Sequence, residues 1–516
     1  MQFKDPLPIN PFTSPVKGEV KLPGSKSITN RALILAALCK KPVTLTGALF
    51  SEDTHIMTKA LNDLGFEVTS DEAASSMHVC GQAKAFKNED LVELFVGNAG
   101  TAARFLTALC AAAPRGTYYL DGVPQMHRRP IRGLIDALRA LGADIRCPRS
   151  EGFFPLEISA HGLLGGNVTI DASESSQMLS ALLMAMPLAK GPAEIRLSKA
   201  VREPFVNMTV SMMKHQFGFD VVRDTQTNII STRPIPIVSE FSRTPSLVEA
   251  GGTYSIEADA SSASYFMALP IVTSGKLTLL KMPFPFSEER ANLQGDGKKF
   301  IDVIERIGAI VEPHKQSKRI ESLFGWFTKA SFTSRKKMPK VEFSSTTEYY
   351  DGVTVEYAQT SRNKISRGKG ITQEFREFSD TFLTIAAIAP LLKEKTVITG
   401  IEHTKKQETN RMEAMARQLE KIFGKEKIIQ KPDSLEIEAA SIGDLRRKLK
   451  SQKEIVTIKT YNDHRVAMSF AILGCFDLLG NGQPWLRIEN PGCCAKTFPN
   501  FFEILGELWK HSHTDS

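Results

Sequence analysis

One pattern of apolar and polar positions recurs along the chain. Apolar residues three and four positions apart line one helix face, a glycine follows, and a short strand begins. A glycine at this place suits the left-handed conformation that ends many helices. The five copies carry Gly65, Gly142, Gly218, Gly308 and Gly424. The pattern predicts a chain built from repeated helix and strand units.

The spacing of these glycines indicates where the repeat is interrupted. The first two intervals are nearly equal, whereas the later ones are longer. We therefore expect insertions near residues 224–250 and 282–350. Residues 166–170 and 193–197 are predicted strands beside the helices, so each unit is expected to be mixed α/β structure.

Length and composition add limits to this picture. With 516 residues the chain exceeds one ordinary hydrophobic core, and two domains are expected. Apolar runs such as residues 382–392 are shorter than the roughly 18 residues that cross a bilayer, and the polar start MQFKDPLPIN has no signal-peptide core. The seven cysteines lack zinc or disulfide spacing. We expect a cytoplasmic protein with no metal and no membrane association.

The net charge of +8 is concentrated in one segment. Residues 315–340 contain eight Lys or Arg and the single acid Glu321, with aromatic residues between them. A surface for RNA, a membrane or a partner is one interpretation. A solvated insertion with a small hydrophobic anchor is the simpler one, and we expect no nucleic-acid partner.

The segment LPGSKSITNRALILAAL, residues 22–38, predicts a site for a small anion. Ser25 or Ser27 can cap an apolar helix whose first amides are unpaired and attract negative charge. Lys26 and Arg31 add two positive charges at this helix start. A solvated basic cap explains this segment equally well when it is taken alone.

Further helix starts share this character, and together they favour the anion site. Taken singly, each fits ordinary capping or surface ion pairing. They are residues 94–106 with Asn98, Gly100 and Arg104; residues 173–185 with Ser175, Ser176 and Gln177; residues 407–419 with Glu408 and Arg411; residues 460–473 with Asp463, His464 and Arg465; and residues 493–505 with Lys496.

Seven motifs in order resemble one family, the 5-enolpyruvylshikimate-3-phosphate synthases. They are PGSKSxxNRALxLAAL, GNAGTAxR, SSQxLxALLMAxPLA, DASSASYF, ETxR, TYNDHRxAM and CxAKTFP, and they extend over residues 22–508 apart from the two insertions. The resemblance implies a two-domain inside-out α/β barrel. Each domain has three repeated α/β units, and two crossing strands join the domains.

The resemblance also implies the domain boundaries. Residues 22–255 form one enolpyruvyl transferase domain, and residues 1–21 with 256–516 form the second, which carries the basic insertion at about 282–350. A sixth unit is expected to end near residue 501.

The reaction implied is transfer of the enolpyruvyl group of phosphoenolpyruvate to the 5-hydroxyl of shikimate 3-phosphate, with release of phosphate. This is a step of the shikimate pathway toward aromatic amino acids. We expect a monomer that uses no cofactor and binds these two small substrates. Fixed guanidinium and ammonium groups neutralise the phosphate and carboxylate groups. Addition needs a base for the hydroxyl and an acid for the methylene carbon.

By resemblance, shikimate 3-phosphate is bound by Lys26, Ser27, Arg31, Ser175, Ser176, Gln177, Arg202, Asp380 and Gln407. Phosphoenolpyruvate is bound by Lys26, Asn98, Gly100, Gln125, Gln177, Arg411, Arg465 and Lys496. The catalytic residues are Asp380, as base for the hydroxyl, with Glu408, Lys26 and His464. Which of Glu408, Lys26 and Lys496 protonates the methylene carbon stays open.

Several positions depart from the family pattern. Gln125 stands where the family has an Arg, with Arg128 or Arg129 as possible substitutes. On the shikimate side, Gln407 replaces Lys, His403 replaces Asn, Arg202 replaces Ser and Phe205 replaces Tyr. Arg202 can compensate by binding the phosphate directly. A lost charged hydrogen bond costs about 1.5 to 3 kcal/mol, or roughly ten- to a hundred-fold in binding, so we expect altered affinity rather than inactivity.

Two alternatives are kept. The first is the related transferase that acts on UDP-N-acetylglucosamine, which shares the repeat but not these motifs. The second is a catalytically impaired homologue whose basic insertion binds RNA or a partner, as the residues at positions 125 and 407 and the charge of residues 315–340 suggest.

Overall fold

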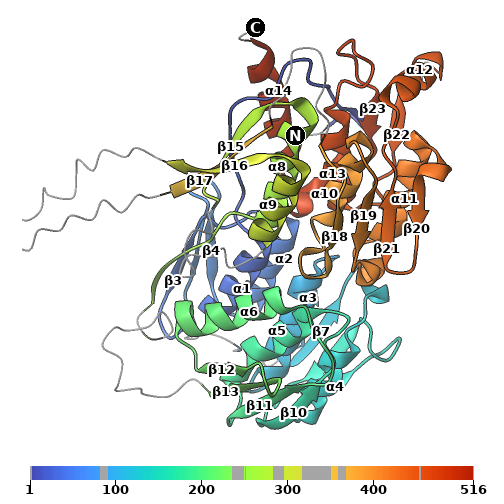
Figure 1. Ribbon diagram of the computed structural model, residues 1–516. Coiled ribbons are helices and arrows are strands. Elements are labelled where there is room, and N and C mark those ends of the chain that lie inside the picture. The colour runs from blue at the N-terminus through green and yellow to red at the C-terminus, as the bar shows by residue number, and fades with distance from the viewer. Residues whose placement is uncertain are drawn as a thin grey trace, which may run out of the picture.

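The computed structural model shows a mixed α/β protein of two halves (Figure 1). It describes residues 3–81, 86, 91–234, 249, 251–282, 296–315, 350–357, 368–452 and 455–514. The basic segment 315–340 lies outside these residues apart from its first position. Within the described parts, no helix has the length and apolar character needed to cross a membrane.

One repeating unit explains most of the fold. In the second copy, two parallel strands are joined by a helix, and a second helix leads into an antiparallel pair. The elements are β6 (Leu91–Phe95), α3 (Gly100–Ala112), β7 (Thr117–Asp121), α4 (Arg132–Ala140), β8 (Asp144–Arg146) and β9 (Leu156–Ser159). The strand order is β6-β7-β9-β8. One buried face of each amphipathic helix covers this small sheet.

Two further copies of the unit complete the first half. The third is formed by β10 (Gly166–Ile170), α5 (Ser176–Ala185), β11 (Ala193–Leu197), α6 (Glu203–Ser211), β12 (Val221–Asp224) and β13 (Ile229–Thr232). The first is formed by α1 (Lys26–Ala37), β3 (Val43–Thr46), α2 (Glu52–Asp63), β4 (Val68–Asp71), β5 (Ser76–Val79) and β14 (Gly252–Ser255). Strand β14 comes from the end of this half and pairs parallel with β3, which closes the set of three.

The second half repeats the unit. Its fourth and fifth sheets have the orders β16-β17-β15-β2 and β18-β19-β21-β20. These contain β2 (Glu19–Lys21), α8 (Ala260–Thr273), β15 (Lys276–Leu280), α9 (Asp296–Ile307), β16 (Ile310–Lys315), β17 (Tyr350–Glu356), β18 (Thr372–Glu374), α10 (Phe382–Ile388), β19 (Thr396–Thr399), α11 (Arg411–Phe423), β20 (Ile428–Gln430) and β21 (Ser434–Ile437), and α12 (Ile442–Gln452) follows.

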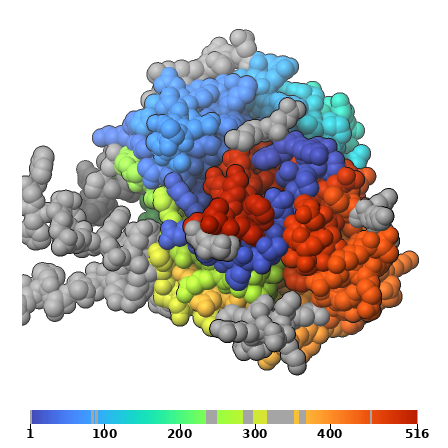
Figure 2. Space-filling model, turned by 90° about the horizontal axis from the view of Figure 1, so that it is seen from above, coloured from blue at the N-terminus to red at the C-terminus, as the bar shows by residue number. Residues whose placement is uncertain are grey.

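The sixth sheet is completed by the start of the chain. It contains β22 (Val456–Ile458), α13 (His464–Gly474), β23 (Leu486–Ile488) and α14 (Phe501–Thr514), and β1 (Leu7–Pro8) pairs antiparallel with β23. Figure 2 shows the dark blue N-terminal and red C-terminal segments side by side. Trp509 Nε1 in α14 donates to Pro11 O at 2.9 Å, which ties the two ends together.

Buried apolar residues form two separate cores. One core extends from Ile28 to Ile256, and the other takes residues from 9–22 and 258–508. The chain passes between them twice, where Gly24 and Ala258 form an antiparallel bridge. A Cβ atom on Gly24 would lie 2.0 Å from Gly47 O, so only glycine permits this close crossing.

Several elements of the sequence prediction are confirmed. The predicted strands 166–170 and 193–197 are β10 and β11. The five repeat glycines all have positive φ, from 86° at Gly218 to 117° at Gly308.

The insertion starting at residue 224 was wrongly placed, because β12 and β13 belong to the third unit. The range 282–350 likewise contains α9 and β16 of the fourth unit. The remaining parts of both ranges lie largely outside the described residues.

Candidate active site

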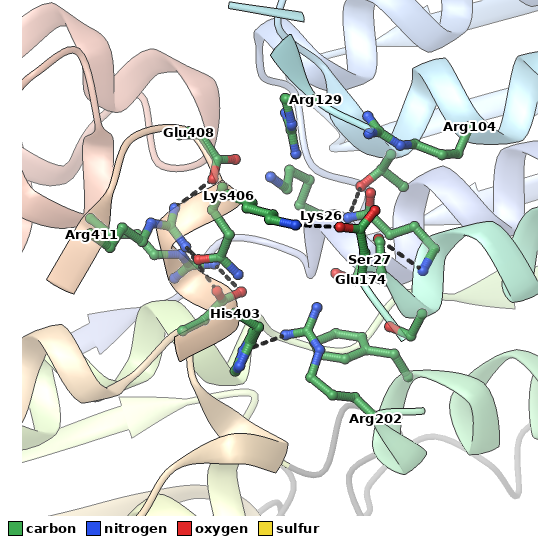
Figure 3. Close-up of a pocket in the computed structure, with 18 of the residues that line it drawn as sticks. Lys26, Ser27, Arg104, Arg129, Glu174, Arg202, His403, Lys406, Glu408 and Arg411 are labelled. Carbon is green, nitrogen blue, oxygen red and sulfur yellow. Dashed lines mark hydrogen bonds and ion pairs between the residues drawn. The ribbon is translucent and has the colours of Figure 1, made fainter. Parts of the chain in front are cut away.

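A polar cleft of about 940 Å³, including its open mouth, lies between the two halves. Figure 3 shows side chains from both halves pointing into it. Its lining residues are Lys26, Ser27, Arg31, Thr101, Arg104, Arg129, Pro130, Glu174, Ser175, Ser176, Gln177, Arg202, Phe205, Asp259, Asp380, His403, Lys406, Gln407, Glu408, Arg411 and Arg465. The eight Lys and Arg outnumber the four carboxylates, so the cleft favours anions.

Helix starts supply most of this lining. In the first half α1, α3, α5 and α6 begin at the cleft, and in the second half α8, α11 and α13 do so. Ser25, Ser175, Asp259 and Asp463 accept backbone N–H bonds as N-caps. The positive ends of these helices therefore add to the charge of the side chains.

Lys26 lies at the crossing of the two halves. Its backbone N–H donates to Asp259 Oδ2 at 3.2 Å, and its Nζ lies 3.1 Å from Asp53 Oδ2. Asp53 is buried in the first turn of α2. The lysine is thus fixed at both ends, with its ammonium group inside the cleft.

Arg31 is buried among neutral partners. Its guanidinium donates to Thr209 Oγ1 at 2.8 Å, Ser27 O at 2.9 Å and Ser180 Oγ at 3.1 Å. Burial lowers the pKa of Arg31 to about 9. Among the described residues, the groups that accept its hydrogen bonds are hydroxyl and carbonyl oxygens, so a bound anion would supply the missing charge.

Arg104 and Arg129 form the other cationic wall of the first half. Arg104 donates to Pro130 O at 2.7 Å, and burial, reinforced by Arg129, lowers the pKa of Arg104 well below its ordinary value. A Cβ atom on Gly100 would lie 2.3 Å from Arg129 Nη2. The glycine at the start of α3 therefore makes room for this guanidinium.

The start of α5 offers hydroxyl and amide groups without charge. Ser175 accepts from the backbone N–H of Gln177 at 3.3 Å, and Gln177 Nε2 donates to Thr101 Oγ1 at 3.2 Å. Ser176 is buried beside them and also lines the cleft. These groups can donate hydrogen bonds to phosphate oxygens.

Two arginines hold Asp380 in the second half. Arg411 Nη1 lies 3.0 Å from Asp380 Oδ1, and Arg465 Nη2 lies 2.9 Å from Asp380 Oδ2. Burial alone would raise the pKa of Asp380, but Arg465 and Arg411, with Arg202, outweigh it and lower this pKa. The carboxylate is therefore ionised at neutral pH.

Glu408 joins the two halves through Lys496. Its carboxylate lies 2.9 Å from Arg411 Nη2 and 3.2 Å from Lys496 Nζ, which also donates to Asn98 O at 3.0 Å. Burial opposes ionisation, but Arg411 and Lys496 lower the pKa of Glu408 well below its ordinary value. Lys496 and Asn98 lie behind the cleft lining, in contact with it through Glu408.

Five predicted site residues do not line the cleft, namely Asn98, Gly100, Gln125, His464 and Lys496. Gln125 is exposed, and the lining contains Arg129 rather than Gln125 or Arg128. His464 is fully buried at the start of α13, and neither ring nitrogen has a hydrogen-bond partner among the described residues. Burial, with the charges of Arg465 and Lys26, lowers its pKa well below the ordinary value, so the ring is neutral.

Sequence reasoning missed several members of the site. Asp53, Asp259, Glu174 and Lys406 were not singled out, because carboxylates and lysines near helix ends usually face solvent. Ion pairs in the folded structure reveal three of them: Asp53 pairs with Lys26, and Glu174 pairs with Lys406 across the cleft. Gln407 was predicted, and its Oε1 accepts from Arg411 Nη1 at 2.7 Å.

Comparison with known proteins agrees with this architecture. The model of the EPSP synthase (3-phosphoshikimate 1-carboxyvinyltransferase) family matches residues 12–505. A protein of Opitutus terrae named 3-phosphoshikimate 1-carboxyvinyltransferase is 47% identical over 517 residues, which cover 100% of both chains. A protein of Sulfurovum with the same name is 35% identical and covers 96% of this chain and 97% of that one.

A solved structure supports the fold alone. EPSP synthase from Acinetobacter baumannii superposes with a TM-score of 0.68 at 21% identity, covering 97% of each chain. The family match spans both halves and every helix start that lines the cleft. The chain belongs to the EPSP synthase (3-phosphoshikimate 1-carboxyvinyltransferase) family.

Proposed function

We propose that the cleft transfers the enolpyruvyl group of phosphoenolpyruvate to the 5-hydroxyl of shikimate 3-phosphate and releases phosphate. One observation carries this function: eight cationic side chains from both halves surround four carboxylates in a single cleft. Both substrates carry a phosphate and a carboxylate, so together they supply the negative charge that the cleft lacks. The family match favours this acceptor over UDP-N-acetylglucosamine.

Shikimate 3-phosphate is assigned to the side of the cleft near Ser27, Arg31, Ser175 and Ser176. Uncharged donors at the α5 start hold its phosphate, and Arg202 reaches the same side of the cleft. Gln177 and Lys26 lie between this side and the side assigned to phosphoenolpyruvate, and they contact both substrates. Gln407 lies on the second half beside Arg411.

Phosphoenolpyruvate is assigned to the arginine-rich side of the cleft. Arg411 and Arg465 hold it from the second half, and Arg104 and Arg129 face it from the first half. The supporting residues are Asn98, Gly100 and Lys496. In this proposal Arg129 supplies the charge that Gln125 lacks, since Gln125 points to the surface.

Asp380 acts as the base for the 5-hydroxyl, because its carboxylate is ionised and lines the cleft. Glu408 is also ionised, so it donates a proton only after accepting one. Lys496 Nζ lies 3.2 Å away and the charge of Lys26 also acts on Glu408, so these two lysines are the candidate sources of that proton. Removal of water by closing halves strengthens these interactions.

The proposal also includes the domain boundaries, the oligomeric state, the cellular location and the absence of a cofactor. The two cores correspond to domains at residues 22–255 and at residues 1–21 with 256–516. The protein acts as a monomer in the cytoplasm without a cofactor.

A phosphate-release assay tests this function. The protein is given phosphoenolpyruvate with either shikimate 3-phosphate or UDP-N-acetylglucosamine. Phosphate formation only with shikimate 3-phosphate supports the proposal. Release with the sugar nucleotide instead selects the related transferase, and silence with both acceptors selects the impaired homologue.

A further inference from the structure

A further contact between the halves lies in the lining of the cleft, at Arg202. This residue precedes α6 in the first half, and its Nη1 donates to Ser379 Oγ at 3.2 Å. The same atom lies 3.5 Å from His403 Nε2, and His403 Nε2 lies 2.8 Å from Ser379 Oγ. Figure 3 shows Arg202 and His403 approaching each other from opposite sides. Three side chains thus form a triangle across the cleft.

The charge state of His403 allows the contacts of this triangle to form. Burial, with the charge of Arg202, lowers the pKa of His403 to about 3, so the ring is neutral at physiological pH. A neutral Nε2 can accept from the Ser379 hydroxyl, whose oxygen then accepts from Arg202. A protonated imidazole would repel the guanidinium instead.

Arg202, Phe205 and His403 are three of the positions that depart from the family pattern, and they meet in one cluster. The Arg202 guanidinium lies 5.8 Å from the centre of the Phe205 ring, which supports it through a cation–π contact. Departures that touch one another indicate one altered function rather than unrelated changes.

The triangle adjoins the assigned base. Ser379 is buried and directly precedes Asp380 in the chain. Arg202 is also one of three arginines whose charge acts on Asp380; the others are Arg411 and Arg465, and Glu408 is the nearby acid. Arg202 therefore links the first half to the position of the base.

We propose that Arg202, Ser379 and His403 form a clasp across the cleft that positions Asp380 for its reaction with shikimate 3-phosphate. Arg202 is the positioning residue of this clasp. The inference rests on the proposed function, because it takes Asp380 as the base.

The test compares Arg202→Gln with the wild type in the full-length chain. We expect kcat/KM for shikimate 3-phosphate to fall about ten- to a hundred-fold, since a charged hydrogen bond and its charge are lost. The acid limb of the kcat/KM profile should move to higher pH, because Asp380 loses a neighbouring cation while Arg411, Arg465 and Glu408 remain. KM for phosphoenolpyruvate should change less than threefold, on the order of normal variation.

A conservative variant separates charge from geometry. Arg202→Lys keeps the charge, so it should restore the acid limb, but it lacks the planar fork and should restore kcat only partly. The Arg202 side chain makes no capping bond to α6, so neither substitution removes a helix cap. Circular dichroism melts check that each variant is folded.

A double-mutant cycle tests whether the clasp acts as one unit. The double variant Arg202→Gln/His403→Ala should match Arg202→Gln within about twofold, because either change already opens the triangle. Arg196→Gln is the matched control, since Arg196 is exposed on β11 and does not line the cleft.

Two failures are distinguishable. If the wild type is active and Arg202→Gln equals it in kcat/KM and in its acid limb, the clasp is overturned and the proposed function stands. Independent, multiplicative effects of Arg202→Gln and His403→Ala would also overturn the clasp. A wild type that releases no phosphate from these substrates contradicts the proposed function itself.

Discussion

At the scale of residues, buried arginines in the two halves have different partners. Arg411 is surrounded by Asp463, Glu408 and Asp380, and these carboxylates outweigh burial and raise its pKa. Arg31 in the first half has hydroxyl and carbonyl partners, and burial lowers its pKa. A bound anion should therefore bring most stabilisation in the first half, near Arg31.

Lys26 should be indispensable to turnover but not to folding. Lys26→Ala removes an ammonium group that lines the cleft and is assigned to both substrates in the proposed function, so we expect kcat to fall at least about a hundred-fold, as for loss of a preorganised electrostatic group. Steady-state kinetics and a thermal melt measure the two effects.

Lys59→Ala is the matched control for this variant. Lys59 is exposed on α2 and pairs with Asp63 in the same helix, so its loss should leave kcat within twofold, roughly as for other surface changes. Equal kcat for Lys26→Ala and the wild type would contradict the role of Lys26.

His403 predicts a pH dependence of stability. Its pKa is about 3 in the folded chain and about 6.5 when unfolded, so the unfolded state binds more protons between these values. Its contribution is complete above pH 6.5 and is lost as pH falls toward 3. Urea unfolding at pH 7 and pH 5 should show a decline that is smaller by about 1 kcal/mol per pH unit in His403→Asn. An unchanged slope in this variant would count against a neutral buried His403.

Much of the site was predictable residue by residue. Lys26, Ser175 and Asp380 stand at helix starts that the sequence motifs mark, and all three line the cleft. The motifs did not reveal that Arg129 rather than Gln125 faces the cleft, because that choice depends on the path of the turn after β7. The pairing of Asp53 with Lys26 joins separate elements and has no local signature.

At the scale of elements, glycine explains why the repeat was visible. Each repeat glycine adopts positive φ after its helix, a conformation that most residues avoid. The end of each repeat helix could therefore be predicted from the sequence. The sixth unit was not identified by such a glycine. Its last strand, β1, comes from the other end of the chain, and α14 follows β23 without a hairpin. Pairing between distant segments leaves no periodic trace.

Gly100→Ala tests how α3 begins. The added Cβ would lie 2.3 Å from Arg129 Nη2, so the guanidinium must move. We expect KM for phosphoenolpyruvate to rise about tenfold, the cost of weakening one charged contact, while KM for shikimate 3-phosphate changes little.

Gly142→Ala provides the contrast. It places a side chain at φ 94° beyond the cleft, and it should cost about 1 kcal/mol of stability without changing either KM. If Gly100→Ala leaves KM for phosphoenolpyruvate unchanged, Arg129 does not contact that substrate.

At the scale of the whole molecule, the two cores meet at a crossing and at the cleft. The bridge between Gly24 and Ala258 keeps the halves together, as the family resemblance implied. Contacts across the cleft, such as Lys406 with Glu174, were not predictable, because they depend on how two separate cores are oriented. Local patterns describe each core but not the angle between them.

Ligand binding should stabilise both cores together. In the proposed function the substrates bind residues from each half, so both substrates at about 100 times their Kd should add roughly 2.7 kcal/mol for each independent site. Calorimetry should show a higher unfolding temperature for every transition. A shift confined to one of two transitions would place the site within a single core.

The central claim is that this cleft joins an enolpyruvyl group to the 5-oxygen of shikimate 3-phosphate. The most direct test is NMR analysis of the products formed from phosphoenolpyruvate and shikimate 3-phosphate, with phosphate measured in parallel. The account predicts one enolpyruvyl ether at the 5-position for each phosphate released, and neither product with Lys26→Ala. Phosphate without the ether, or an ether at another hydroxyl, would contradict it.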